Sequence, residues 1–101
     1  MSRYRMEDGS VVNTDKAQEN WEEDTYWNGN NHISKATGSQ WNHEQLYKSR
    51  KGRYYKECWS QWQGSTAYVE WLSEREAVRW LLVNDHGIPD DLKHLVDEVE
   101  E

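Results

Sequence analysis

The most regular pattern of apolar and polar residues lies in the middle of the chain. Two runs of β-favouring residues, 45–49 and 53–60, are separated by Arg50-Lys51-Gly52, and this glycine can take the positive φ of a tight hairpin turn. A third run, 67–72, alternates from side to side with the period of a half-buried strand. The pattern predicts a three-stranded antiparallel β-meander.

Two helices are expected after the meander. Ser73 and Glu76 have the spacing of a capping box, which marks a helix start, and an apolar face follows from Ala77 onward. We expect Gly87 to end this helix in the left-handed conformation, ahead of Pro89. A second helix should begin near Pro89, with one apolar stripe made by Leu92, Leu95, Val96 and Val99.

The N-terminal part of the chain shows much weaker periodicity. Residues 1–20 carry only scattered apolar positions, too few to offset the entropy lost on ordering, so we expect a flexible acidic and polar tail. Residues 21–40 contain more aromatic side chains and a turn signal at Asn28-Gly29, and a short strand could form near His32. The predicted organisation is a tail (1–20) and one α+β domain (21–101), in which the meander packs against two C-terminal helices beside an irregular Trp-rich N-terminal arm.

The composition is rich in aromatic residues and indicates a cellular compartment. The 101 residues suit a single core, and the seven tryptophans and six tyrosines with no phenylalanine favour half-wet positions and interfaces. The single cysteine, Cys58, allows no internal disulfide, and no apolar run approaches the roughly 18 residues of a membrane span. We therefore expect a cytoplasmic protein that does not contact a membrane.

Charge is uneven along the chain. The net charge is −7, which disfavours nonspecific attachment to nucleic acid, yet residues 48–56 contain five basic and no acidic side chains. Interleaved tyrosines make this hairpin resemble a surface that holds a single strand and stacks its bases. Nucleic-acid binding is therefore the alternative function, through Lys48, Arg50, Lys51, Arg53, Tyr54, Tyr55 and Lys56. The simpler interpretation is a solvated turn whose charges discourage edge pairing.

Familiar catalytic and metal-binding patterns are missing from the sequence. The four histidines, at positions 32, 43, 86 and 94, do not have the spacing of a known metal site. Cys58 has no neighbouring base in the sequence to activate it, and no glycine-rich phosphate loop is present. We expect no enzymatic activity, no metal and no cofactor.

The best candidate binding surface is the Trp-rich loop after the second strand. An aromatic side chain at a loop tip is hard to bury, and tryptophans dominate protein–protein hot spots. We predict contact with an unidentified protein partner through Trp59, Gln61, Trp62 and Gln63. A homodimer interface would hide the same side chains, and a carbohydrate platform of Trp59, Trp62, Tyr54 and Gln61 is a minor alternative.

Several linked motifs resemble a family of small uncharacterised bacterial proteins, some of them on mobile elements. The motifs are TGSQWNHEQLY (37–47), SRKGRYY (49–55), WSQWQGS (59–65), EREAVRWLLVN (74–84) and IPDDL (88–92), so the resemblance covers roughly residues 24–92. It implies a self-contained domain without a known activity. A small binding protein, such as an accessory or inhibitor protein of a mobile element, is the function we expect.

Overall fold

The structure is a computed structural model of the chain and describes residues 3–62, 64 and 66–96. These residues form eight strands, one α-helix and two short 3-10 helices, which confirms the α+β class. The elements are β1 (Arg3–Arg5), β2 (Val11–Asn13), η1 (Thr14–Lys16), β3 (Glu19–Glu22), β4 (Thr25–Trp27), β5 (His32–Ser34), β6 (Asn42–Lys48), β7 (Tyr54–Ser60), β8 (Tyr68–Leu72), α1 (Glu74–Val83) and η2 (Asp90–Leu95).

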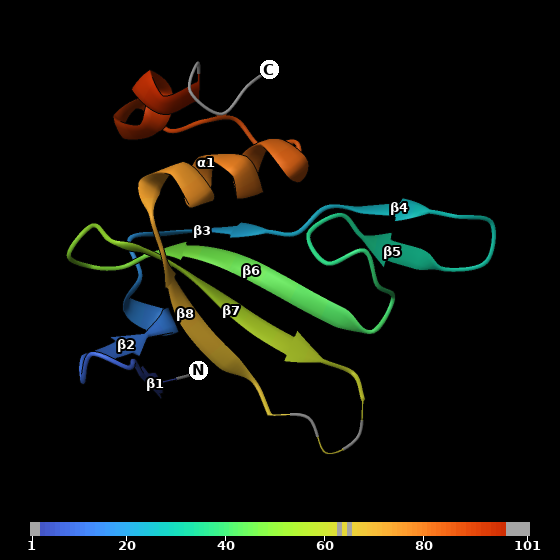
Figure 1. Cartoon of the computed structure of the whole chain (residues 1–101), viewed down its shortest axis with the longest axis horizontal. Helices are drawn as coiled ribbons and strands as arrows, with labels where there is room; N and C mark the ends of the chain where they lie inside the picture. The colour runs from blue at the N-terminus through green and yellow to red at the C-terminus, as the bar shows by residue number, and fades with distance from the viewer. Residues whose placement is uncertain (1–2, 63, 65, 97–101) are drawn as a thin grey trace.

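The central sheet is antiparallel and has four strands in the order β3-β6-β7-β8 (Figure 1). The predicted meander is present as β6, β7 and β8, and Gly52 in the β6–β7 turn has the expected positive φ of 92°. The prediction of only three strands was wrong, because β3 pairs with the free edge of β6. Its sequence, ENWE, has a single apolar residue, so backbone pairing rather than side-chain pattern makes it a strand.

One face of the sheet is covered by α1 and η2. Leu46 and Tyr54 from the sheet pack against Val78 and Leu81 of α1 and Leu92 of η2, all of them buried. The predicted capping box is confirmed. The Ser73 hydroxyl accepts a hydrogen bond from the Glu76 N–H at 3.1 Å, and the Glu76 carboxylate accepts one from the Ser73 N–H at 3.0 Å.

The end of α1 differs from the prediction, because Asp85 rather than Gly87 takes the left-handed conformation, with φ of 59°. The N–H of His86 bonds to the carbonyl of Leu81 at 2.9 Å, and that of Asp85 bonds to Leu82 at 3.2 Å, which is a Schellman ending. A contact distant in sequence sets this position: buried Asn84 accepts a hydrogen bond from the Asp24 N–H at 2.8 Å.

The second C-terminal helix is a 3-10 helix and not the α-helix that the apolar stripe suggested. Contacts with the sheet position it, since the Asp91 carboxylate receives hydrogen bonds from Lys48 at 3.1 Å and from Tyr54 at 3.0 Å. A short element held in this way does not depend on i→i+4 bonds of its own. Val99, the last residue of the predicted stripe, lies outside the described residues.

The N-terminal hairpin β1–β2 covers the opposite face of the sheet. Met6 and Val12 are buried there against Tyr47 and Tyr55. The segment predicted as a flexible tail therefore carries β1, β2, η1 and the start of β3. Its few apolar residues are sufficient because the sheet already offers an aromatic surface to pack on. The molecule has three layers, and both faces of β7 are covered.

The Trp-rich arm is also more regular than predicted. Besides β3 it contains the hairpin β4–β5, which extends to one side of the sheet (Figure 1) and pairs Tyr26 with Ile33. Tyr26 and Trp27 are exposed on this hairpin, whereas Ile33 is buried. Over the part of the chain that the structure describes, no helix is long and apolar enough to cross a membrane.

Candidate functional site

Two tryptophans are exposed together at one end of the β6–β7 ladder. Trp41 directly precedes β6 and Trp62 follows β7, and their exposed fractions are 40% and 59%. Their ring centroids are 4.9 Å apart, and the Gln61 N–H bonds to the Trp41 carbonyl at 2.9 Å, which joins the two segments. We call Trp41 and Trp62 the tryptophan pair. Exposed apolar surface of this kind is typical of an interaction site.

The other predicted partner-binding residues are placed differently. Gln61 is exposed beside the tryptophan pair, and Gln63 lies outside the described residues. Trp59 is half-buried on the sheet, where its ring stacks on His43 with centroids 5.9 Å apart. Of the predicted set, only Gln61 and Trp62 are thus seen at an exposed surface.

Trp41 was not among the predicted site residues. It lies in an irregular stretch before β6, which has no periodicity from which its direction could be read. Its proximity to Trp62 depends on the register of β6 and β7, which pairs Asn42 with Ser60. A tryptophan a few residues before the predicted hairpin, with another shortly after it, is the signal that could have identified the pair.

The structure divides the predicted basic hairpin between the two faces of the sheet. Lys48, Tyr54 and Lys56 face α1 and η2, where acidic side chains hold them. Lys48 and Tyr54 both bond to Asp91, and Lys56 lies 3.0 Å from Glu44 and 3.1 Å from Glu70. These three residues are therefore engaged within the fold.

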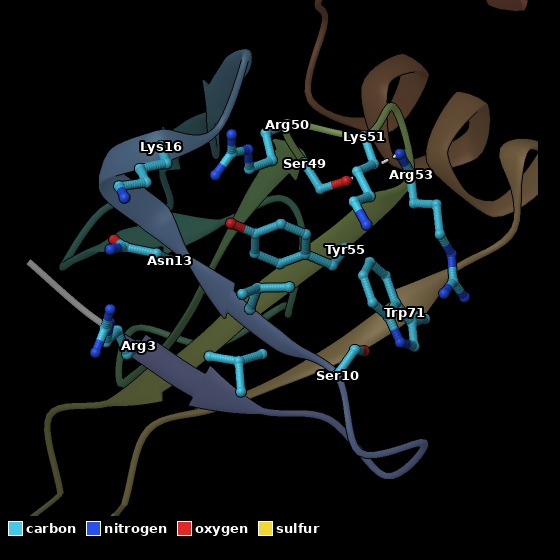
Figure 2. A pocket seen from close by; sticks show the side chains of 12 residues that line it. Arg3, Ser10, Asn13, Lys16, Ser49, Arg50, Lys51, Arg53, Tyr55 and Trp71 are labelled. Carbon is cyan, nitrogen blue, oxygen red and sulfur yellow. Dashed lines mark hydrogen bonds between the residues drawn. The ribbon is translucent and has the colours of Figure 1, made fainter.

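The remaining residues of the predicted basic hairpin line a pocket of about 560 Å³ on the other side of the sheet (Figure 2). The pocket lies between the β6–β7 turn (residues 49–53), β8 and the N-terminal segment. We call it the basic pocket, and its charged and polar lining comprises Arg3, Ser10, Asn13, Lys16, Ser49, Arg50, Lys51, Arg53, Tyr55 and Trp71. Four residues of the predicted basic hairpin thus lie around one pocket: Arg50, Lys51, Arg53 and Tyr55. Arg3 and Lys16, from the segment predicted as a tail, add two further cations to it.

The turn at the rim of the basic pocket is held by its own hydrogen bonds. The Ser49 N–H bonds to the Arg53 carbonyl at 2.7 Å, and the Ser49 hydroxyl accepts from the Arg53 N–H at 3.0 Å. Gln18 donates to the Arg50 carbonyl at 3.0 Å, which ties the turn to the N-terminal segment. The backbone that carries Arg50 and Lys51 is therefore fixed, while their side chains extend into solvent.

Arg53 occupies the wall of the basic pocket beside Trp71. Its guanidinium lies 3.8 Å from the centroid of the Trp71 ring, a cation–π contact, and 3.5 Å from the Asp8 carboxylate. The two hydrogen bonds from Ser10 are the main reason why the pKa of Asp8 is below its ordinary value. Asp8 is thus a carboxylate that balances Arg53 from the β1–β2 turn.

The hydroxyl of Tyr55 lies at the floor of the basic pocket. Tyr55 is completely buried, and its hydroxyl has no hydrogen-bond partner among the described residues. Burial, together with the nearby Glu57 carboxylate, raises the pKa of Tyr55 to about 12. The neighbouring Tyr47 and Tyr4 hydroxyls, in contrast, both donate to Glu57.

The ionisable and thiol groups on the helix side form a second cluster. Glu44 accepts hydrogen bonds from the Trp80 indole and from Lys56, each at 3.0 Å, and Cys58 lies next to it at 3.8 Å. Burial is the main cause that raises the pKa of the Cys58 thiol to about 11, followed by the Glu44 carboxylate. The thiol is protonated at neutral pH, so it is a weak nucleophile there.

Three of the histidines have structural neighbours. His43 Nδ1 lies 2.7 Å from Glu23, His86 Nε2 contacts the Glu22 carbonyl, and His32 packs against Trp27. Within residues 3–62, 64 and 66–96, no three His, Cys, Asp or Glu side chains are grouped as a metal site needs.

Comparisons with known proteins do not add a family to this picture. No family model, no curated protein and no solved structure matches the chain. The resemblance to small bacterial proteins stays a prediction, and the functional argument rests on the tryptophan pair and the basic pocket.

Proposed function

We propose that the protein is a non-catalytic binding protein that contacts another protein through the tryptophan pair. The observation that carries the proposal is the exposure of two adjacent indole rings, 40% for Trp41 and 59% for Trp62, at 4.9 Å between centroids. Tryptophan is enriched in interface hot spots, where its truncation typically costs at least about 2 kcal/mol of binding free energy. Burial of the pair by a partner would supply most of such a hot spot.

The structure of the basic hairpin favours this function over binding of a nucleic-acid strand. Strand binding needs aromatic faces on which bases can stack. Tyr54 is 2% exposed and Tyr55 is fully buried, so neither ring offers such a face. The Lys48 and Lys56 ammonium groups are already paired with carboxylates.

The tryptophan pair can be tested without disturbing the basic pocket. The pair lies at the end of the ladder where Asn42 faces Ser60, and the pocket lies at the other end, beyond the pairing of Lys48 with Tyr54. Six residue steps along an extended strand separate these ends by about 20 Å. Substitutions at one site should therefore leave the other intact.

The test compares three forms of the full chain as bait in a bacterial lysate. Trp62→Ala removes one ring of the tryptophan pair. Trp27→Ala is the matched control, because Trp27 is 60% exposed but lies on the β4–β5 hairpin. A protein recovered by the wild type and by Trp27→Ala is then purified, and its dissociation constant is measured for all three forms.

The expected result is a loss of affinity of about 30-fold for Trp62→Ala and less than threefold for Trp27→Ala. Equal affinities for the three forms would reject the tryptophan pair as the binding surface. Sedimentation of the purified wild type over a range of concentrations separates self-association from partner binding. A dimer abolished by Trp62→Ala would assign the pair to a homodimer instead.

A further inference from the structure

The basic pocket concentrates positive charge on a protein that is otherwise strongly acidic. Arg3, Lys16, Arg50, Lys51 and Arg53 all line it, whereas the net charge of the whole chain is −7. These five cations come from β1, from η1 and from the β6–β7 turn. Like charges repel one another, so collecting them in one pocket costs free energy unless an anion neutralises them.

Four of the five cations have no acidic partner among the residues that the structure describes. Arg53 is paired with Asp8, but Arg3, Lys16, Arg50 and Lys51 form no ion pair with any acidic side chain in the described part of the chain. The other lysines differ, because Lys35, Lys48, Lys56 and Lys93 are all paired with carboxylates. Four unpaired cations are thus gathered in the basic pocket, although Arg5 and Arg79, which also form no ion pair among the described residues, lie outside it.

The Tyr55 hydroxyl is a second and independent indication of a ligand. A buried donor that lacks a partner costs roughly 1–3 kcal/mol, and few such groups are left in folded proteins. Figure 2 shows the hydroxyl end of Tyr55 directed toward the side of the pocket where Asn13, Lys16 and Arg50 lie. Lys16 and Arg50, which line the pocket with Tyr55, have exposed side chains.

The shape and chemistry of the basic pocket restrict the ligand. A volume of about 560 Å³ suits a small molecule and not a duplex or a folded partner. One face of the Trp71 ring is covered by Arg53, and Tyr55 packs against the same indole in a T-shaped contact with centroids 5.9 Å apart, which reduces the aromatic surface left for a stacked strand. Arginine and lysine donors around one cavity are typical of phosphate recognition.

The geometry points to a binding site for a compact ligand that carries two or more phosphate groups, such as a nucleoside diphosphate. Arg50, Lys51, Arg3 and Lys16 supply the charge that neutralises the phosphates, and the Tyr55 hydroxyl donates one hydrogen bond from the floor. Val11 and Val12 line the same pocket and give apolar contact for the rest of the ligand. This site is separate from the tryptophan pair, and it does not depend on the proposed protein partner.

Calorimetric titration of the full chain tests the assignment with four probes. These are pyrophosphate, ADP, inorganic phosphate and a single-stranded oligonucleotide of about ten nucleotides, each at low and at moderate salt. The variants are Arg50→Gln in the turn and Arg79→Gln on α1 as a control with the same charge change. Arg79 is exposed on the helix-covered side of the sheet and does not line the pocket.

We expect pyrophosphate and ADP to bind at least tenfold more tightly than inorganic phosphate, with an affinity that falls as salt rises. Arg50→Gln should weaken binding of both by about tenfold, and Arg79→Gln by less than twofold. Absence of binding by pyrophosphate and ADP at about 1 mM, or equal losses in the two variants, would overturn the assignment. So would tight binding of the oligonucleotide alone, which would favour a strand.

Tyr55→Phe separates ligand binding from folding. The variant keeps the buried ring and removes only the hydroxyl, so its thermal midpoint should not fall, because no protein hydrogen bond is lost. Its affinity for ADP should nevertheless fall several-fold, by the value of one hydrogen bond to a charged acceptor. An unchanged affinity in the folded variant would remove Tyr55 from the site and leave a cluster of surface cations only.

Discussion

At the scale of the residue, Tyr47 and Tyr55 show that the surroundings of a hydroxyl group decide what it contributes to stability. They are direct cross-strand neighbours on one face of the sheet, and their rings stack with centroids 5.2 Å apart. The Tyr47 hydroxyl donates to Glu57 at 3.2 Å, whereas the Tyr55 hydroxyl has no partner among the described residues. Two chemically identical side chains therefore differ in what their hydroxyl groups contribute.

Substitution of each tyrosine by phenylalanine should change stability in different directions. Tyr47→Phe leaves Glu57 with one donor fewer and should lower the free energy of unfolding by about 1 kcal/mol. Tyr55→Phe removes a buried donor without a partner, so it should leave this free energy unchanged or raise it by up to about 1 kcal/mol. Urea unfolding at neutral pH measures both, and an equal loss in the two variants would mean that the Tyr55 hydroxyl has a partner.

At the scale of the element, the N-terminal hairpin is the part of the fold that the number of apolar residues predicts worst. Its turn carries Asp8-Gly9, a strong hairpin signal, and Gly9 has the positive φ of 89° that this turn requires. Strand β2 places Val12 inward at 6% exposure and Val11 outward at 61%. A hairpin with so few buried side chains is stable only because the sheet provides Tyr47 and Tyr55 to cover.

The two adjacent valines of β2 give a matched test of this packing. Val12→Ala removes buried methyl groups and should lower the free energy of unfolding by about 2 kcal/mol. Val11→Ala changes an exposed side chain with the same backbone preference, and its effect should stay within about 0.5 kcal/mol. Chemical denaturation reports both values, and indistinguishable small effects would contradict the docking of the hairpin.

At the scale of the whole molecule, covering the sheet on both sides buries groups that usually face water. Burial is the largest cause of the raised pKa values of Tyr47, Tyr54, Tyr55 and Cys58. Burial lowers the pKa of Lys56, but the hydrogen bonds that its ammonium donates to Glu44 and Glu70 raise it overall. For each group the folded protein holds a proton more tightly than the unfolded chain does. This common direction links stability to alkaline pH.

The free energy of unfolding should therefore be nearly constant from about pH 7 to pH 9 and fall above that range. Above the unfolded pKa of each group, the unfolded chain loses a proton that the folded protein retains, so rising pH favours unfolding. Cys58 enters first, with a pKa of about 11 against an ordinary value of 9.0, and the tyrosines and Lys56 follow. Urea unfolding at a series of pH values measures the decline.

Tyr55→Phe is the control for this dependence. The pKa of Tyr55 is about 12 in the folded protein against an ordinary value of 10.0, so the variant lacks one of the groups that link stability to pH. Its stability should fall less steeply than that of the wild type above pH 10. Stability that is constant or rising up to about pH 11 would show that the aromatic layers are open to water.

Signals that act over a few residues were sufficient to predict the middle of the fold from the sequence. Gly52 and the β-favouring runs around it identify the β6–β7 hairpin, and Ser73 with Glu76 identifies the start of α1. Trp62 was predicted to be exposed because a loop tip is hard to bury, and it is. In each case the physical cause lies within one turn or one helix end.

Only the tertiary structure decided which charges and aromatic rings are free. Strand alternation separates Lys56 from Tyr55, but the acidic partners of Lys56 and the cover over Tyr55 come from distant segments. The basic pocket exists because the N-terminal hairpin docks beside the β6–β7 turn, and the tryptophan pair exists because strand register brings Trp41 to Trp62. The sequence by itself determined the local elements, and packing between elements determined both candidate sites, because burial and ion pairing are properties of neighbours far apart in the chain.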